Sequence, residues 1–385
     1  MSVTAAKGFV AAGVRAGIKA SGNPDLALVQ NVGPRQAGAA VFTSNRCQAN
    51  PILWSKEAIK DGHIAAIVLN SGGANCYTGP FGFQTTHATA ERVAERLQVS
   101  AGDVLVCSTG LIGVGDQTFR DAVLHGVDLA VEALTADGGP DAATAIMTTD
   151  SVSKQSVRTG QGYIIGGMAK GAGMLAPGLA TMLVVITTDA DLDSATLDRA
   201  LRAATRVSFD RLDSDGCMST NDQVTLMASG ASGVTPDEAE FTAVLTEVCL
   251  DLALQLLRDA EGSSHDITIE VRGAASEDDA VVVGKSVARS NLFKAAMFGA
   301  DPNWGRVLAA IGTTDAEFDP YNIDVSFNGV RLSTKGQPDQ PRELVDLTPR
   351  DIHVLIGLNV GEATATVWTN DLTHEYVHEN SAYAS

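Results

Sequence analysis

The run "MLVVITT" at 182–188 constrains the fold more than any other stretch, because nearly every residue in it is apolar or β-branched. Continuous runs of this length are typical of strands that are covered on both faces. Alternation in "DITIEVRG" at 266–273 instead indicates a strand with one wet face. Together with 182–188, seven further segments predict strands: 63–71, 104–109, 224–229, 267–271, 323–327, 352–358 and 363–368.

Helical patterns lie between these runs. The segment 84–97 is one, and 194–205 is another with Ser194 as its expected N-cap. The clearest covers 236–262, where Thr235 is the expected cap, Pro236 begins the helix and Gly262 ends it. Because strands and helices interleave without a repeat or linker, we expect an α/β or layered α+β fold with mixed sheets between helices.

Composition excludes several classes of partner. The chain has 385 residues and a formal net charge of −19, which argues against nucleic acid and anionic membranes. An anionic substrate would therefore need local positive charge at its site. No signal-peptide pattern or apolar span is present, so we expect a cytoplasmic protein. The five cysteines are widely spaced and predict buried thiols rather than disulfides or zinc ligands.

Two familiar motifs occur in the wrong context. "HEYVH" at 374–378 matches the zinc motif H-E-x-x-H, but it has no third ligand downstream and no helical run around it. "GKS" at 284–286 has Asp279 where a phosphate-binding loop needs glycine, and it follows an acidic run. We therefore expect neither a metal nor a tightly bound cofactor.

A Gly-rich segment at 166–178 precedes the central apolar run and contains Lys170, a candidate anion-binding residue. A second cluster, "CSTGLIG" at 107–113, follows a predicted strand. Its Thr109 hydroxyl and Gly110 N–H are candidate oxyanion donors. Thr181, which begins the apolar run, would by itself be an ordinary first residue of a strand.

These segments resemble the ornithine acetyltransferase family, whose members cut their own chain and acetylate glutamate in arginine synthesis. The likeness begins with "KGAGMLAPGLATMLVVITTDA" at 170–190 and runs almost end to end. It includes "GFVAAGVRAGIKASG" (8–22), "NSGGANCYTG" (70–79), "CSTGLIG", "AIMTTD" (145–150), "DSDGCMSTND" (213–222), "DAEGSS" (259–264), "DPNWGRVLAAIG" (301–312) and "ENSAYAS" (379–385).

The resemblance implies a self-cleaving fold of the N-terminal-nucleophile type. The cut falls between Ala180 and Thr181 and divides the chain into an α chain, 1–180, and a β chain, 181–385, which intertwine. The new α-amine of Thr181 then lies beside its own hydroxyl. An α-amine has a pKa of about 7.7–8.0, so it can act as the base for that hydroxyl near neutral pH.

The implied reaction moves the acetyl group of N2-acetyl-ornithine to glutamate through an acetyl ester on Thr181. Thr109 and Gly110 form the oxyanion hole, and acetyl-CoA remains open as a second donor. The expected assembly is a heterotetramer of two α and two β chains. The residues implied to line the substrate pocket are Thr148, Lys170, Thr181, Glu261, Asn380 and Ser385.

Two segments depart from the family pattern: Gly73 stands where many relatives have Asn, and Cys217–Met218 replaces an Asp-Thr pair. No site residue is therefore taken from 70–79 or 213–222. Two other readings stay open: a self-processing N-terminal-nucleophile aminopeptidase or amidase, in which water is the acceptor, and an uncleaved binding protein in which Thr181 is only structural.

Overall fold

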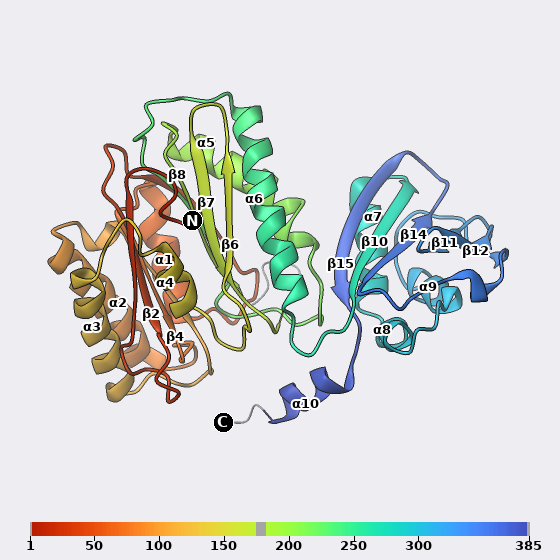
Figure 1. Ribbon diagram of the computed structural model, residues 1–385, viewed down its shortest axis with the longest axis horizontal. Coiled ribbons are helices and arrows are strands. Elements are labelled where there is room, and N and C mark those ends of the chain that lie inside the picture. Colours follow the sequence, from red (N-terminus) through yellow and green to blue (C-terminus); the bar gives the residue numbers. More distant parts are fainter. Residues whose placement is uncertain (1, 175–181, 383–385) are drawn as a thin grey trace. The chain divides into compact units, whose positions relative to one another are not determined.

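The computed structural model describes residues 2–174 and 182–382 (Figure 1). The chain divides into two compact units. The first contains Met1–Ala172, Gly178–Asp210 and Met218–Leu256, and the second contains Gly173–Pro177, Arg211–Cys217 and Leu257–Ser385. Each unit has its own sheets and its own buried core, so each is described by itself.

The first sheet of unit 1 has four strands in the order β1 (Phe9–Val14), β2 (Leu26–Asn31), β4 (Ala66–Ser71) and β5 (Val104–Thr109). Only β4 and β5 run parallel, and the other neighbours are antiparallel. Helices α2 (Gly79–Leu97) and α3 (Gln117–Glu132) cover one face, where Val93 and Val123 join the core that contains Val68 and Val106.

The second sheet of unit 1 has five strands in the order β3 (Ala37–Phe42), β9 (Gln223–Ala228), β8 (Leu183–Thr188), β7 (Ile164–Lys170) and β6 (Lys154–Thr159). Strands β8 and β9 are parallel, and β7 is antiparallel to β8. Its inner face packs on the first sheet, where Leu69 and Cys107 share a core with Val185 and Met227.

The remaining helices of unit 1 surround these two sheets. Helix α6 (Glu238–Arg258) packs closely on β7. A Cβ added at Gly167 of β7 would contact the side chains of Leu252 and Val248 on this helix. Helix α5 (Ser194–Arg206) contacts β3, α1 (Asn50–Ala58) contacts β5, and α4 (Gly139–Ala145) contacts β1. Unit 1 is therefore two mixed sheets between layers of helices.

Unit 2 has one six-stranded sheet in the order β13 (Gln337–Pro338), β12 (Val330–Thr334), β11 (Asp324–Phe327), β14 (Asp351–Gly357), β10 (Asp266–Ala274) and β15 (Ala363–Asn370). One pair, β10 and β14, is parallel. Helices α7 (Glu277–Ala288), α8 (Asn291–Phe298) and α9 (Trp304–Ile311) supply core residues, and α10 (His374–Ala382) follows β15. Short 3-10 helices cover Ile59–Asp61, Ala101–Asp103, Phe209–Arg211 and Arg342–Leu344.

The predicted fold class is confirmed, since all three sheets are mixed and are combined with helices. Each of the eight predicted strands is present within a few residues at its ends, and β10 buries alternate side chains as expected. In the described residues, no helix has the length and apolar character needed to cross a membrane.

The three predicted helices are present, but the two predicted N-caps were wrong. Asp193, rather than Ser194, caps α5 by accepting a hydrogen bond from Thr196 N at 2.8 Å. Helix α6 begins at Glu238, after Asp237 accepts from two backbone amides, and it ends at Arg258 rather than Gly262. In both cases an aspartate carboxylate binds the exposed N–H groups in place of the neighbouring hydroxyl.

Some features were not predicted. Helix α10 contains the "HEYVH" motif, although it has no buried residue and therefore no apolar stripe to reveal it. The expectation of buried thiols is correct for Cys76, Cys107 and Cys249 but wrong for Cys47 and Cys217, which are exposed.

Strand β1 approaches helix α4 so closely at Gly13 that a larger residue there should destabilise the fold. A side chain at Gly13 would place its Cβ 2.0 Å from the Asp141 carbonyl oxygen, and a backbone atom cannot easily move away. We expect Gly13→Ala to lower the free energy of unfolding by about 1–3 kcal/mol, measured by urea denaturation. Gly305→Ala is the control: the nearest atom to its Cβ is a side-chain oxygen at 3.4 Å, so no loss should follow.

Candidate functional site

Two strand ends in unit 1 bring Lys170 and Thr109 together. Lys170 is the last residue of β7, Thr109 is the last residue of β5, and the two side chains are 1% and 3% exposed. Lys170 Nζ donates a hydrogen bond to Thr109 Oγ1 at 3.1 Å. Because this bond uses a lone pair of the hydroxyl, it orients Thr109 without consuming the proton that an oxyanion donor needs.

The turn after Thr109 requires glycine at position 110. Gly110 has φ +131°, and a Cβ there would lie 2.5 Å from Gly73 N. The same Gly73 N–H donates to Thr109 O at 3.0 Å. The Thr109–Gly110 turn is therefore held against the 72–73 backbone in a conformation that other residues rarely adopt.

Asp150 is the centre of a buried polar cluster beside Lys170. Its carboxylate accepts from Thr148 N at 2.8 Å, from Lys154 Nζ at 2.5 Å and from Gly171 N at 2.6 Å. Thr148 is thus fixed through its backbone, and Gly171 continues the chain directly after Lys170. One carboxylate ties the loop that contains Thr148 to the end of β7.

The charges of this cluster partly compensate each other. Burial alone would raise the pKa of Asp150, but the charges of Lys170 and Lys154 and their contacts lower it to about 2. Lys19 adds a third ammonium, which donates to Met147 O at 2.7 Å and to Pro24 O at 2.8 Å. Burial lowers the pKa of Lys19, and the charge of Lys170 contributes. Three lysines therefore supply the local positive charge that an anionic substrate needs in a chain of net charge −19.

The start of β8 lies beside the same strand end. Lys170 pairs with Leu183 in the β7–β8 register, and Leu183 pairs with Gln223 of β9. Met182 N donates to Asp222 Oδ1 at 3.0 Å, just before these two strands begin. Ala180 and Thr181 lie outside the described residues, as does Ser385.

Unit 2 contains a second candidate cluster around Glu261. Asn380 Nδ2 on α10 donates to Glu261 Oε2 at 3.0 Å, which connects these two predicted site residues. Glu261 also borders a cavity of about 210 Å³, roughly the liquid volume of seven waters and enough for a small amino-acid side chain. The cavity lining consists of Ser214, Asp215, Glu261, Asn291, Lys294, Asn370, Asp371, Leu372 and Tyr376.

Acidic groups outnumber basic ones in this lining. Asp215 accepts from Met174 N at 2.7 Å and from Cys217 N at 3.1 Å, and burial with the nearby charge of Glu261 raises its pKa. Lys294 is held by Ser214 O, Thr369 Oγ1 and Asn370 O. Burial lowers the pKa of Lys294 to about 8. A cation bound between Asp215 and Glu261 would relieve the repulsion of their negative charges.

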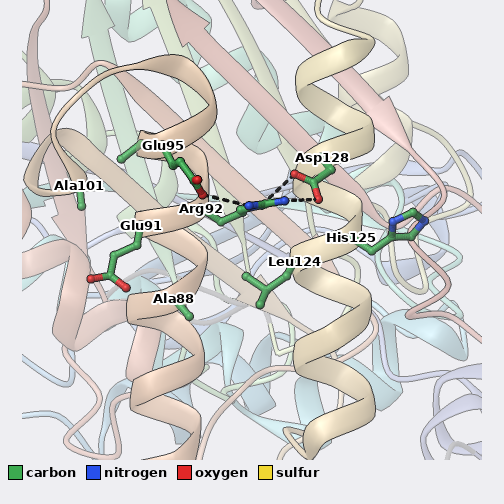
Figure 2. Close-up of a pocket in the computed structure, with 9 residues that line it drawn as sticks. Ala88, Glu91, Arg92, Glu95, Ala101, Leu124, His125 and Asp128 are labelled. Atoms are coloured by element: carbon green, nitrogen blue, oxygen red, sulfur yellow. Dashed lines mark hydrogen bonds and ion pairs between the residues drawn. The ribbon is translucent and has the colours of Figure 1, made fainter.

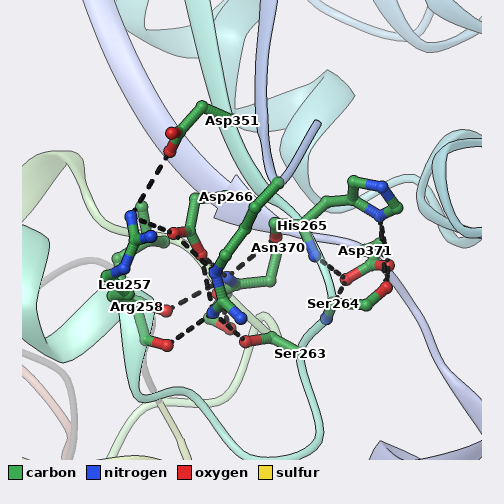
Figure 3. A network of polar contacts seen from close by, with 11 residues as sticks. Leu257, Arg258, Ser263, Ser264, His265, Asp266, Asp351, Asn370 and Asp371 are labelled. Carbon is green, nitrogen blue, oxygen red and sulfur yellow. Dashed lines mark hydrogen bonds and ion pairs between the residues drawn. The ribbon is translucent and has the colours of Figure 1, made fainter. Parts of the chain in front are cut away.

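A hydrogen-bond network holds part of the cavity wall (Figure 3). Asn370 Nδ2 donates to Leu257 O and to His265 O, both at 3.1 Å. Asp371 accepts from Ser264 Oγ and contacts His265 Nδ1 at 2.8 Å. Ser264 and Asp371 face the same ring nitrogen, so the relay of a serine hydrolase, which uses both ring nitrogens, is not formed. We interpret this network as structural support.

A larger groove, about 660 Å³, lies between α2 and α3 (Figure 2). It contains none of the predicted site residues. Arg92 crosses it and pairs with Asp128 at 2.8 Å and with Glu95 at 2.9 Å. Glu95 is exposed while Arg92 and Asp128 are partly buried, and these three charges satisfy one another, so they leave no free group to direct chemistry.

The described residues contain no group of three His, Cys, Asp or Glu side chains that could hold a metal ion. The two histidines of "HEYVH", His374 and His378, do lie on one helix, contrary to the expectation. The motif nevertheless lacks a third ligand among the residues that the structure describes, and a zinc site needs at least three protein ligands.

Comparison with known proteins identifies the family, because the ArgJ family profile matches residues 10–385. The chain belongs to the ArgJ family. It is 62% identical to the arginine biosynthesis bifunctional protein ArgJ of Streptomyces coelicolor and 63% identical to that of Streptomyces avermitilis, over all of each chain. A solved ornithine acetyltransferase from Mycobacterium tuberculosis, complexed with ornithine, is 48% identical, with a TM-score of 0.42. That match covers 47% of this chain and 96% of the solved chain.

The ArgJ-family chain thus groups its predicted site residues in two places. Thr109, Gly110 and Lys170 lie together in unit 1, with Thr148 joined to them through Asp150, while Glu261 and Asn380 lie together in unit 2. Sequence reasoning missed three buried charged residues, Asp150, Lys154 and Asp222, and the partly buried Asp215. Asp150 and Lys154 lie in or just after a recognised motif, and Asp215 and Asp222 lie in the 213–222 segment that was set aside: their signal was present but was not used.

The buried Asp150 pair predicts a pH dependence. Its folded-state pKa of about 2 lies below the usual 3.8, so its stabilising contribution is complete above pH 3.8 and is lost as the pH falls through 2. At pH 6 we expect Asp150→Asn to lower the free energy of unfolding by about 3–5 kcal/mol, because Lys154 and Lys170 lose their counter-charge. Urea denaturation at pH 6 and at pH 2.5 measures the difference in unfolding free energy between wild type and this variant. That difference should be smaller at pH 2.5. The exposed Glu343→Gln change should have little effect at either pH.

Proposed function

We propose that this protein transfers the acetyl group of N2-acetyl-ornithine to glutamate, a step of arginine biosynthesis, with Thr181 as the nucleophile. One observation carries the proposal: Lys170, buried and bonded to Thr109, pairs with Leu183, which is two residues after Thr181. The candidate oxyanion donors therefore lie at the same strand end as the start of the chain segment that Thr181 begins. The names of the close relatives and the ornithine in the solved relative support this substrate class.

The proposed chemistry begins with self-cleavage. Thr181 Oγ attacks the carbonyl carbon of Ala180, the peptide C–N bond breaks, and the chain is joined by an ester. Water then hydrolyses the ester, which leaves a carboxylate on Ala180 and a free α-amine on Thr181. The Ala180 and Thr181 assignments rest on the sequence motif, and the resulting chains are 1–180 and 181–385.

Acetyl transfer repeats the same logic. Thr181 Oγ attacks the acetyl carbon, its proton passes to the α-amine, and the bond to the ornithine nitrogen breaks as that nitrogen takes up the proton. The amine of glutamate then attacks the ester, and Oγ leaves with a proton returned to it. In this proposal Thr109 Oγ1 and Gly110 N–H stabilise the oxyanion in both steps, and the hydrogen bond from Lys170 to the Thr109 hydroxyl supports that role.

The remaining groups recognise substrate. Lys170 and Lys19 supply positive charge toward substrate carboxylates, and Thr148 contributes a hydroxyl held in place through Asp150. In unit 2, Glu261 and Asp215 would bind the side-chain ammonium of ornithine in the 210 Å³ cavity, with Asn380 orienting Glu261. Ser385 stays a predicted contact of the C-terminal segment.

Three wider features belong to the same proposal. The relatives are named bifunctional, which supports acetyl-CoA as a second acetyl donor to glutamate. We also expect a heterotetramer of two α and two β chains, and a cytoplasmic location. Assays with each acetyl donor test the use of acetyl-CoA, and native mass spectrometry tests the heterotetramer.

Self-cleavage is the first test. Scaling 39.9 kDa by 180/385 and by 205/385 gives expected bands of about 18.7 and 21.2 kDa on a denaturing gel of wild-type protein. Thr181→Ala should remain a single chain of 39.9 kDa and should lose acetyl transfer, because it lacks the hydroxyl. Active wild-type protein that runs as one chain would contradict the mechanism. Acetate release that does not depend on glutamate would instead favour a hydrolase.

The acidic cavity makes a substrate-specific prediction. Asp215→Asn and Glu261→Gln should each raise KM for N2-acetyl-ornithine about tenfold or more, because a charge-assisted hydrogen bond of about 1.5–3 kcal/mol is lost. KM for glutamate should not rise, since its side chain carries no ammonium. Exposed Glu343→Gln is the matched control. An equal rise in KM for N2-acetyl-ornithine and in KM for glutamate would show that Asp215 and Glu261 do not bind the ammonium group.

A further inference from the structure

Asp222 has a buried carboxylate that the proposed reaction has not used. It comes directly before β9 and is fully buried. Its Oδ1 accepts a hydrogen bond from Met182 N at 3.0 Å. Its Oδ2 is buried with no hydrogen-bond partner among the described residues. A buried carboxylate that is half satisfied costs free energy, so the unpaired oxygen needs a physical explanation.

The environment of Asp222 shows what this oxygen lacks. Burial raises the pKa of Asp222 well above its usual range, while Met182, Ser219 and the charge of Lys170 act in the opposite direction. In the part of the chain that the structure describes, Lys170 is the charged group that acts on it, and Lys170 shares its own charge with Asp150. Ser219 thus lies close to the carboxylate and favours its charged form, but Oδ2 itself accepts no hydrogen bond among the described residues.

Chain connectivity limits where a new donor can arise. The backbone nitrogens of Met182 and Thr181 are separated by three covalent bonds, so they lie no more than about 4.3 Å apart in any conformation. The carboxylate that holds the Met182 amide is therefore near the nitrogen that becomes an α-amine if the chain is cut before Thr181. Before the cut this nitrogen is an amide, and afterwards it gains additional N–H groups.

We propose that Asp222 is the positioning residue of the α-amine formed by self-cleavage: Oδ1 holds the Met182 amide, and Oδ2 accepts an N–H from that amine. The inference rests on the proposed function, which makes Thr181 the N-terminal residue of the β chain. A neutral amine has two N–H groups and one lone pair. One N–H directed at Oδ2 limits rotation of the amine and leaves its lone pair to face the Thr181 hydroxyl.

The substitution Asp222→Asn tests this assignment. Asparagine keeps an oxygen for the Met182 amide and almost the same volume, but it puts an NH₂ donor where Oδ2 accepts. We expect the variant to fold and to complete self-cleavage. Its kcat for acetyl transfer should fall about tenfold to a hundredfold, a part of the 10²–10⁴ that a positioned base contributes. KM for N2-acetyl-ornithine should change less than about twofold, because substrate contacts are intact.

Asp189→Asn is the matched control. Asp189 is also buried and follows the other end of β8, where its carboxylate accepts from Ile164 N at 2.7 Å and from Lys7 N at 3.2 Å. This variant should melt at a lower temperature while kcat stays within about twofold of wild type, because it is remote from Thr181 along the strand. A general cost of losing a buried carboxylate would lower kcat in both variants, and that result would overturn the proposal.

The remaining outcomes are also decisive. A cleaved Asp222→Asn chain with wild-type kcat overturns the proposal, and so does a folded chain that is not cut, because Asp222 would then act on the cut rather than on its product. If Asp222→Asn does not fold, Asp222→Glu is the second variant. It displaces the carboxylate by one methylene, and unchanged kcat there would refute the positioning role. Wild-type protein that remains at 39.9 kDa would instead refute the proposed function itself.

Discussion

The pairing of β7 with β8 is the interaction on which the candidate site depends. Six residue pairs join Ile165–Lys170 to Leu183–Thr188 in antiparallel register, and β9 pairs with the other side of β8. These ladders hold Lys170 and Leu183 at one end of the sheet whether or not the chain between them is continuous. A cut before Thr181 would thus remove a covalent link without releasing either strand, because neighbours on both sides of each remain paired.

The sheet also has a consequence for the two proposed chains. Strands β3, β6 and β7 would belong to the α chain, and β8 and β9 to the β chain. Neither chain could then bury this sheet alone, since β8 has one neighbour from each. Stability after cleavage would depend on side chains such as Val185 and Met227, which pack against Leu69 and Cys107 in the shared core.

Buried charge at the site is arranged by compensation. Asp150 balances Lys154 and Lys170, and Lys170 in turn orients the Thr109 hydroxyl. The acids Asp215 and Glu261 in unit 2 are less well compensated, as is Asp222 in unit 1. Under the proposed mechanism an amine compensates the negative charge in both places. The side-chain amine of ornithine does so at Asp215 and Glu261, and the new N-terminal amine does so at Asp222. Acids whose negative charge is incompletely compensated therefore mark the places where amines are expected.

Much of the architecture could be predicted from the sequence. Apolar runs such as 182–188 predicted the strands because buried strands exclude polar residues, and the motifs predicted Thr109, Gly110, Lys170 and Glu261 as site residues. Local patterns failed where the determining contact was distant in sequence or where the signal was weak. The strands β1 and β7 are rich in glycine and alanine, and helix α10 lacks an apolar face, so neither kind of element has a strong periodicity.

By itself the sequence determined the fold class and the family and predicted Thr181 as the nucleophile, because these follow from residue types at short spacing. Only the tertiary structure decided which charges meet. Lys170 and Thr109 are 61 residues apart in the chain, and Met182 and Asp222 are 40 apart, yet each pair forms a hydrogen bond. Such contacts depend on strand order and register, and one residue of slippage would turn Lys170 to the other face of its sheet.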